Sequence, residues 1–302
     1  MRGKRLKNAG DALGHQVLIK AIQSAKLFLP LWLNSDAGPR LYDNEPRVFD
    51  ALQRRWKGTI DASQYSYSDF GAWQRGLNRC PFLLKLPGMD KPGRDVLEAA
   101  CGDGMVGAVL HSFGHRVTLM DLDDWRDNRA KHLPFFRQDL SRDMAEGERF
   151  DLIFSYNAFE HIDKPDVAFA NMVKMLRPGG LLYLDFGPLY CSAWGLHAYT
   201  TLHMPFSQFL FSPRFIEETI AREGVSDLGV TSFKLQPLNQ WHLYQFEEMF
   251  SSSGLRPLYR KDFHADRFLP FALRFRSSFT GRGLTIDDLK TQAIAICLQK
   301  PA

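Results

Sequence analysis

Short apolar runs alternate with amphipathic stretches through the middle of the chain. The runs are rich in β-branched and aromatic residues, whereas the stretches between them repeat their apolar residues at helical spacing. The predicted strands are 94–99, 117–121, 135–139, 150–156 and 181–186, and the clearest predicted helices are 103–113 and 165–176. This alternation predicts the α/β class, with a parallel sheet covered by helices on both faces.

The pattern is different on both sides of this region. The first 90 residues have no clean strand pattern, although Gly14–Leu29 and Pro46–Trp56 show helical spacing, and Lys91-Pro92-Gly93 forms a turn. We therefore predict a helical N-terminal extension or cap over 1–90 and one α/β domain over 91–302. Further predicted elements are helices 213–223 and 243–253 and closing strands 255–263 and 291–299, which make the sheet seven-stranded.

A long aromatic segment, about 187–240, interrupts the rhythm after the fifth strand. Long connections of this kind inside a compact domain are usually functional. We expect the segment to form the substrate pocket, with its side chains at the carboxyl edge of the sheet. The candidate substrate-binding residues are Tyr190, Trp194, His197, Tyr199 and His203. The alternative is that these aromatic residues only pack an inserted subdomain.

The turn after the first strand carries the main motif, Gly102-x-Gly104-x-x-Gly107. Glycines let the backbone turn sharply and approach a ligand closely. The same pattern occurs in dinucleotide-binding proteins, so by itself it is weakly specific. The neighbouring residues separate the alternatives, because Glu98 stands at the strand end, where a carboxylate suits a cationic amino group and would repel a pyrophosphate.

Two more acids end the next two predicted strands. Asp121 is placed to accept hydrogen bonds from ribose hydroxyls, and Asp139 from an adenine amino group. Each acid has a structural alternative, as a surface turn residue or a helix cap. Acids at three successive strand ends form a row that suits an amine, a ribose and a base.

Three segments in this order closely resemble the class I S-adenosylmethionine-dependent methyltransferases, in particular the branch called methyltransferase domain 11. They are Val96–Gly104, Phe150–Ile162 and Leu176–Leu182. The resemblance covers 94–186 well and 241–300 loosely, and it implies a Rossmann-like fold with S-adenosylmethionine as cofactor. One departure is Ala100, which replaces the family's first glycine, and a positive φ would disfavour its methyl group.

The resemblance also implies which residues bind the cofactor. Glu98, Ala100, Gly102 and Gly104 would hold its methionyl part, and Asn157 would line the site near the sulfonium. Asp121 with Leu122 would take the ribose, and Asp139 with Leu140 would border the adenine. In relatives an aromatic residue before the first strand often closes over the cofactor, and Tyr65, Tyr67 or Trp73 is in place to do so; Tyr67 is the residue that we select.

Methyl transfer to a hydroxyl is assisted by a base near the carboxyl edge of the sheet. His197 is the first candidate, because imidazole titrates in the useful range, and His161 is the second. The structural alternative is that Glu160 and His161 only fix the loop after the fourth strand. His197 and His203 are six residues apart without a nearby acid cluster, so we expect no metal site.

Composition and charge indicate which kind of substrate the protein binds. The 302 residues carry 38 basic and 34 acidic side chains, a mild excess of +4 that does not indicate a nucleic-acid-binding surface. The Asn/Asp-Pro-Pro-aromatic signature of many enzymes that methylate nucleobase amines is absent, which favours a small-molecule acceptor such as a sugar or natural-product intermediate. A homodimer is compatible with the sequence.

The four cysteines are well separated and form no Cys-x-x-Cys pair, so a reducing cytoplasm is expected. The apolar run Leu27–Leu33 is too short to span a bilayer. It follows a basic N-terminus, so peripheral contact with a membrane surface is the minority alternative to an ordinary helical extension.

Two other functions compete with methyl transfer. A nicotinamide-dependent oxidoreductase would share the glycine pattern, but Glu98 and the segment Arg177–Leu182 argue against it. A non-catalytic interaction module would keep the fold with a degenerate cofactor loop, whereas this loop is nearly intact.

Overall fold

The computed structural model describes residues 2–60, 68–142, 149–227 and 230–302. Its centre is a seven-stranded sheet with the order β3-β2-β1-β4-β5-β9-β8. Strands β1 to β5 are mutually parallel, and β9 runs antiparallel to both of its neighbours, β5 and β8. The predicted α/β class, with a mostly parallel sheet, is therefore confirmed. The strands are β1 (Asp95–Ala99), β2 (Arg116–Asp121), β3 (Phe135–Arg137), β4 (Phe150–Tyr156), β5 (Leu176–Phe186), β8 (Arg256–His264) and β9 (Thr291–Gln299).

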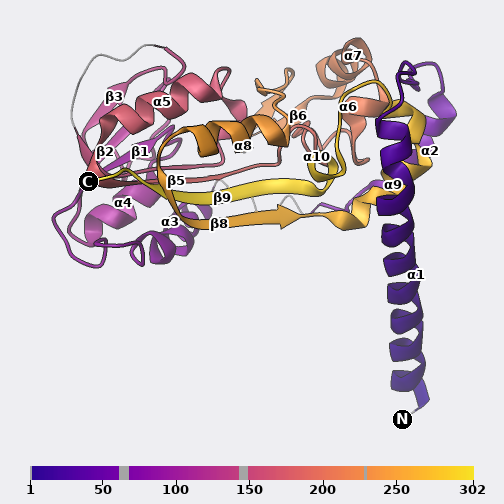
Figure 1. Cartoon of the computed structure of the whole chain (residues 1–302), viewed down its shortest axis with the longest axis horizontal. Helices are drawn as coiled ribbons and strands as arrows, with labels where there is room; N and C mark the ends of the chain where they lie inside the picture. Colours follow the sequence, from indigo (N-terminus) through magenta and orange to yellow (C-terminus); the bar gives the residue numbers. More distant parts are fainter. Residues whose placement is uncertain (1, 61–67, 143–148, 228–229) are drawn as a thin grey trace.

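Helices cover both faces of this sheet (Figure 1). On one face α3 (Asp69–Leu83) and α4 (Met105–Ser112) share a core with Val96, Phe154 and Tyr183. On the other face α5 (Pro165–Met175) and α8 (Leu243–Ser252) pack on Leu97 and its neighbours. Successive residues of a strand point to opposite faces, so the continuous apolar runs of β1 and β4 supply both cores at once.

A third core lies beyond the carboxyl edge of the parallel strands, at the right-hand side of Figure 1. We call this part the helical lobe. Its aromatic centre includes Phe206, Phe271 and Phe279, whose rings stack or meet edge to face. It is built from α1 (Arg2–Leu33), α2 (Pro46–Trp56), α6 (Ser207–Leu210), α7 (Pro213–Glu223), the 3-10 helices η3 (Asp266–Phe268) and η4 (Arg276–Ser278), α9 (Leu269–Arg274) and α10 (Ile286–Lys290).

The helical lobe combines three distant parts of the chain. They are the first two helices, the segment after β5 and the connection between β8 and β9. A short hairpin, β6 (Val225–Asp227) and β7 (Val230–Ser232), follows α7. The predicted division at residue 90 stays a prediction, but residues on the two sides of it pack together in two of the hydrophobic cores. Helix α3 packs on α4 beneath the sheet, while α1 and α2 belong to the lobe.

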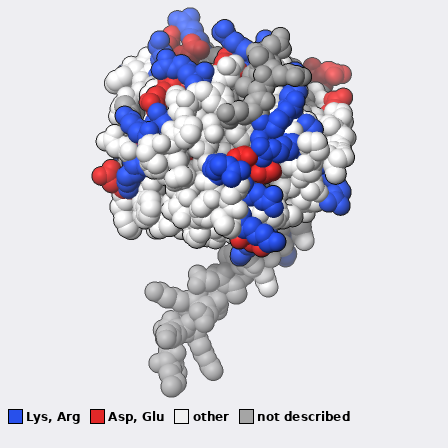
Figure 2. Space-filling model, turned by 90° about the vertical axis from the view of Figure 1, so that its left-hand side faces the viewer, with Lys and Arg blue, Asp and Glu red and all other residues white. Residues whose placement is uncertain are grey.

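Ion pairs tie the amino ends of the parallel strands together. Arg116 of β2 contacts Asp95 at 2.5 Å, and Arg177 of β5 contacts Asp95 at 2.7 Å and Asp151 at 3.0 Å. The two guanidinium groups lower the pKa of Asp95 to about 2. Figure 2 shows this side of the molecule, where basic and acidic side chains are interspersed, so the basic residues named here are partnered rather than gathered in an open stripe.

Two further observations concern the cysteines and the question of a membrane-spanning helix. The four cysteines are buried and free. Within the described ranges, no helix combines the length and the apolar character needed to cross a membrane.

Candidate active site

Conformation and close packing fix the glycines of the turn between β1 and α4. Gly104 begins the helix with φ 67, and a Cβ atom there would lie 2.7 Å from Leu119 Cδ1. A Cβ on Gly107 would lie 2.6 Å from Leu119 Cδ2 and 2.7 Å from Glu98 Oε2. Both positions therefore require glycine, one for its conformation and both for the close approach of α4 to the sheet.

Ala100 occupies the left-handed region with φ 52. The departure from the family's glycine therefore falls at a position where the backbone still takes the glycine-like conformation. An alanine there costs about 1 kcal/mol relative to glycine. The loop keeps its sharp turn, and the residue that carries the strain lies next to the glycines of the motif.

The three predicted acids do stand at successive strand ends. Glu98 is 4% exposed, and its Oε2 accepts a hydrogen bond from the Gly107 amide at 2.7 Å. Burial raises the pKa of Glu98 to about 8. Its carboxyl group thus joins β1 to α4 from inside the protein, while its predicted contact with the methionyl part of the cofactor stays a prediction.

Asp121 and Asp139 lie nearer the surface. The Asp121 carboxylate accepts hydrogen bonds from the Gly102 amide at 2.8 Å and the Leu122 amide at 2.7 Å, and burial raises its pKa. Asp139 accepts from the Ser141 amide at 2.8 Å and pairs with Arg142 at 3.2 Å. Each carboxylate oxygen can accept more than one hydrogen bond, so these contacts orient the acids and leave capacity for a ligand.

The remaining predicted cofactor residues flank this row. Leu122 is exposed, whereas Leu140 is buried in the core under α5. Asn157 is exposed, with φ 50, and its amide donates to the Asp185 carbonyl at 2.8 Å. Tyr67 lies outside the described residues. The acid-lined edge and the turn at Gly102, where a Cβ atom would meet nothing within 4 Å, fit a cationic, ribose-bearing cofactor such as S-adenosylmethionine.

Helix α3 adds two arginines that the sequence analysis missed. Arg75 pairs with Asp103 of the glycine turn at 2.6 Å, and the Arg79 guanidinium lies over the Tyr156 ring at 4.5 Å. Tyr156 ends β4, so the two arginines reach the loops at the ends of β1 and β4. They are four residues apart and therefore share a face of the helix. The four-residue spacing of Arg75 and Arg79 is the sequence signal for these residues. It places them on one face only if the segment is a helix, which the sequence analysis did not predict.

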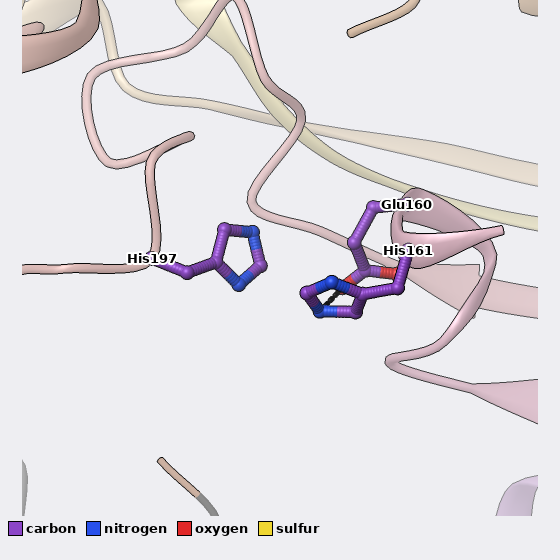
Figure 3. A group of neighbouring side chains, drawn as sticks. All are labelled: Glu160, His161 and His197. Carbon is purple, nitrogen blue, oxygen red and sulfur yellow. Dashed lines mark ion pairs between the residues drawn. The ribbon is translucent and has the colours of Figure 1, made fainter. Parts of the chain in front are cut away.

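A second group of side chains meets beside the ends of β4 and β5 (Figure 3). It consists of Glu160 and His161, on the 3-10 helix η2 (Phe159–His161) after β4, and His197, from the segment after β5. We call it the Glu-His-His cluster. One ligand-type atom from each residue lies within 4.8 Å of the other two. The two imidazole rings meet edge to face with 4.7 Å between centroids. The two predicted catalytic histidines are thus neighbours.

Backbone contacts hold each member of the cluster. Glu160 is 2% exposed, and its Oε1 accepts from the Gly187 amide at 3.1 Å. His161 Nδ1 lies 2.8 Å from the Pro237 carbonyl, and His197 Nε2 lies 2.8 Å from the Pro188 carbonyl. Burial raises the pKa of Glu160 to about 8, while burial and the neighbouring His161 lower the pKa of His197 to about 3. The cluster is therefore fixed in place, and burial favours the uncharged forms of Glu160 and His197.

The other predicted acceptor residues lie in the helical lobe. Trp194 is 4% exposed and meets Phe268 edge to face, so it packs in the lobe core. Tyr190 and Tyr199 are partly buried against the same core. His203 Nδ1 lies 3.0 Å from the Tyr199 carbonyl, and its amide donates to Gln53 at 2.8 Å, so His203 joins the lobe to α2 and not to the cluster. Roles in acceptor binding stay predictions for all four.

The strand order, the glycine turn and the acids at the strand ends define a class I S-adenosylmethionine-dependent methyltransferase. A family model described as a methyltransferase domain matches residues 68–222, about half of the chain, and the protein belongs to that family. The match begins at the N-cap of α3, which places the arginine-bearing helix inside the family's domain. The nicotinamide-dependent alternative is not favoured.

Curated relatives are distant. A ubiquinone biosynthesis O-methyltransferase from Rhizobium etli is 26% identical over 176 residues, which span 50% of this chain and 68% of that enzyme. The enzyme of the same name from Coxiella burnetii is 27% identical over 101 residues, 31% of this chain and 43% of the relative. The glycine N-methyltransferase of Rattus norvegicus is 30% identical over 156 residues, 44% and 50% of the two chains. The chain thus spans about half or less of the length of the last two relatives.

Solved structures resemble the chain only loosely. An S-adenosylmethionine-dependent methyltransferase from Clostridium acetobutylicum gives a TM-score of 0.45 at 16% identity, covering 86% of this chain and 99% of the other. The phosphoethanolamine N-methyltransferase 2 of Haemonchus contortus, solved with S-adenosyl-L-methionine, gives 0.46 at 18% identity, covering 84% and 60%.

Proposed function

We propose that the protein transfers a methyl group from S-adenosylmethionine to a hydroxyl oxygen of a small molecule. The observation that carries the proposal is the Glu-His-His cluster beside the ends of β4 and β5. A hydroxyl must lose its proton as it is methylated, whereas a neutral amine already offers its lone pair. A cluster of imidazole and carboxyl groups fixed at the carboxyl edge of the sheet therefore favours oxygen over nitrogen.

The residues at the edge of the sheet divide the work. S-adenosylmethionine supplies an electrophilic methyl group on a sulfonium, which departs as a neutral thioether. Asp121 and Asp139 orient the cofactor through its hydroxyl and amino groups, and the exposed Asn157 lies between them and the cluster in the order of strand ends. Much of the rate enhancement then comes from holding the two reactants in line.

The assistance to the acceptor hydroxyl is assigned to the cluster rather than to His197 alone. A base works best when its pKa is near the working pH, and that of His197 is lowered to about 3. His161 lies 4.0 Å from the Glu160 carboxyl group and is more open to solvent than Glu160. The same segment after β5 that supplies His197 also carries Tyr190 and Tyr199, which are partly buried against the lobe core.

A small-molecule acceptor fits the composition of the segment after β5, which combines aromatic residues with His197. An aromatic wall with few placed polar groups is typical of small-molecule sites. The names of the ubiquinone O-methyltransferases add support for oxygen as the acceptor atom, although they say nothing of this chain's own acceptor. A sugar or a natural-product intermediate carries suitable hydroxyls, and the mild net charge of +4 fits such a substrate better than nucleic acid.

The test compares acceptors and variants in one assay. Purified protein is given labelled S-adenosylmethionine with matched panels of small hydroxyl and amine compounds, and methylated products are identified by mass spectrometry. His197→Ala should lower turnover on a hydroxyl acceptor by roughly 100-fold or more and leave S-adenosylhomocysteine affinity nearly unchanged. The exposed His132 gives the matched control, His132→Ala. Methylation confined to amines, or full activity of His197→Ala, would refute the proposal.

We also propose that the N-terminal helix contacts a membrane surface, which was the minority alternative to an ordinary helical extension. One face of α1, with Leu29 and Leu33, packs in the helical lobe, while Leu27 and Leu31 on another face are exposed. Residues 2–33 contain six basic side chains and one acidic one, a net +5 that exceeds the +4 of the whole chain. Apolar side chains within a basic helix suit an anionic lipid surface and would repel a second copy of the same helix.

Sedimentation with vesicles tests this contact. The protein should bind phosphatidylglycerol vesicles more than phosphatidylcholine vesicles, and the pair Leu27→Ser and Leu31→Ser should weaken binding. Equal recovery with both vesicle types, or a mutant pair that binds like the unaltered protein, would contradict it.

A further inference from the structure

The orientation of the two cluster histidines is fixed by carbonyl groups. A carbonyl oxygen only accepts hydrogen bonds, so His161 Nδ1 and His197 Nε2 must carry the hydrogens in those contacts. In each neutral ring the opposite nitrogen, His161 Nε2 or His197 Nδ1, then presents a lone pair. Metal-binding histidines are oriented in the same way, with one ring N–H donated to a backbone carbonyl.

Glu160 supplies the second, independent observation. Its Oε1 accepts from Gly187, but its Oε2 is buried and has no hydrogen-bond partner among the described residues. A buried carboxyl oxygen without a partner is costly, and it is found where an ion or a water molecule completes the site. This oxygen belongs to the same side chain that stands beside His161 Nε2 (Figure 3).

We propose that Glu160, His161 and His197 bind one divalent transition-metal ion, of which Zn²⁺ is the leading candidate. Two imidazole nitrogens and one carboxylate oxygen are a donor set that Zn²⁺ and its first-row neighbours accept, with one or more positions left open. The donor atoms, within 4.8 Å of one another, need to approach to about 3.4 Å for bonds of about 2.1 Å in a tetrahedron. Binding the ion would therefore require the side chains to rotate toward one another.

The ion would explain how the cluster assists a hydroxyl acceptor, and this part of the inference rests on the proposed function. A divalent ion stabilises the deprotonated form of an oxygen placed at its open position. The hydroxyl proton leaves to water, the new O–C bond forms while the S–C bond of the cofactor breaks, and the thioether leaves with the electron pair. His161 and His197 then act as ligands and not as bases.

The sequence favoured no metal because it paired His197 with His203, six residues away. The fold instead brings His197 to the Glu160–His161 pair after β4. A second candidate group consists of Cys191, His242 and Asp288. It is less suited to an ion, because both Asp288 oxygens already accept hydrogen bonds, from Leu243, Thr285 and His242.

Calorimetry on the full chain, stripped with a chelator and dialysed, tests the site with Zn²⁺ and with Co²⁺, whose visible absorption reports imidazole coordination. We expect about one ion per chain. His197→Ala and His161→Gln should weaken binding by at least roughly 10-fold to 100-fold, as even outer-shell changes do. His132→Ala, which alters the exposed His111–His132 pair, should leave binding unchanged.

Circular dichroism and S-adenosylhomocysteine binding show whether each variant is folded. Absence of Zn²⁺ and Co²⁺ binding by the unaltered chain, or equal binding by a folded His197→Ala variant, would overturn the metal site. The two proposals can fail separately. If hydroxyl methylation persists in the presence of chelator, the role of the metal is refuted and the proposed function stands. If the protein binds the metal but methylates only amines, the proposed function is refuted and the metal site stands.

Discussion

The buried carboxyl group of Glu98 makes the stability of the protein depend on pH in a way that one substitution can isolate. Glu98 is 4% exposed and holds the Gly107 amide at 2.7 Å. Burial raises its pKa from 4.5 to about 8, with smaller contributions from the nearby Asp103 and Asp121. Glu98→Gln keeps the size and an oxygen acceptor for Gly107 but removes the ionisation.

The sign follows from proton binding. Below pH 4.5 the glutamate is protonated in both the folded and the unfolded chain. Between 4.5 and about 8 the unfolded chain releases the proton and the folded chain keeps it, so the free energy of unfolding falls as pH rises. At 1.36 kcal/mol per pH unit, this window corresponds to as much as about 5 kcal/mol, and the loss is complete above about pH 8.

Denaturant unfolding at pH values from 5 to 8.5, followed by circular dichroism without cofactor, measures the effect. The Gln variant should gain stability relative to the unaltered protein as pH rises, by several kcal/mol across the range. Glu217→Gln, at an exposed position of α7, controls for loss of a charge. If the difference in unfolding free energy between the unaltered protein and Glu98→Gln is the same at every pH, Glu98 is not kept neutral by burial and the reasoning is wrong.

Three further predictions test the cofactor turn and the helical lobe. Asp121→Ala should weaken S-adenosylhomocysteine binding in calorimetry by roughly 1–3 kcal/mol, because it orphans hydrogen-bonded partners; unchanged affinity would exclude the ribose role. Ala100→Gly should stabilise the protein by up to about 1 kcal/mol in denaturant unfolding by relieving the left-handed alanine, and a clear loss would contradict the assigned φ. Phe206→Ala should cost about 3–5 kcal/mol because this side chain is fully buried, and a cost near zero would show that the lobe core is not packed as described.

Local patterns predicted most of the α/β framework. Strands β4 and β9 and helices α2 and α7 have the bounds that their apolar spacing indicated. In each, the residues that define the element are neighbours along the chain, so the period of the pattern reports the structure directly.

Helix α3 escaped prediction because its sequence contains glycines and a proline. Gly71 and Gly76 lower the helix propensity of the segment, and Pro81 lies near the helix end. In the structure Gly76 lets α3 approach α4, since a Cβ atom there would lie 2.7 Å from the Met105 carbonyl. The helix is thus stabilised by a neighbour that the local pattern does not contain, and Arg75 and Arg79 were missed with it.

The sequence by itself determined the sheet, the glycine turn and the acids at the strand ends, because each depends on residues close together in the chain. Only the tertiary structure decided which side chains meet across long separations. It joined α1 and α2 to the segments after β5 and before β9 in one core, and it set His197 against Glu160 and His161 instead of His203. Such contacts depend on how long connections fold back over the sheet, where packing rather than local periodicity selects the partner.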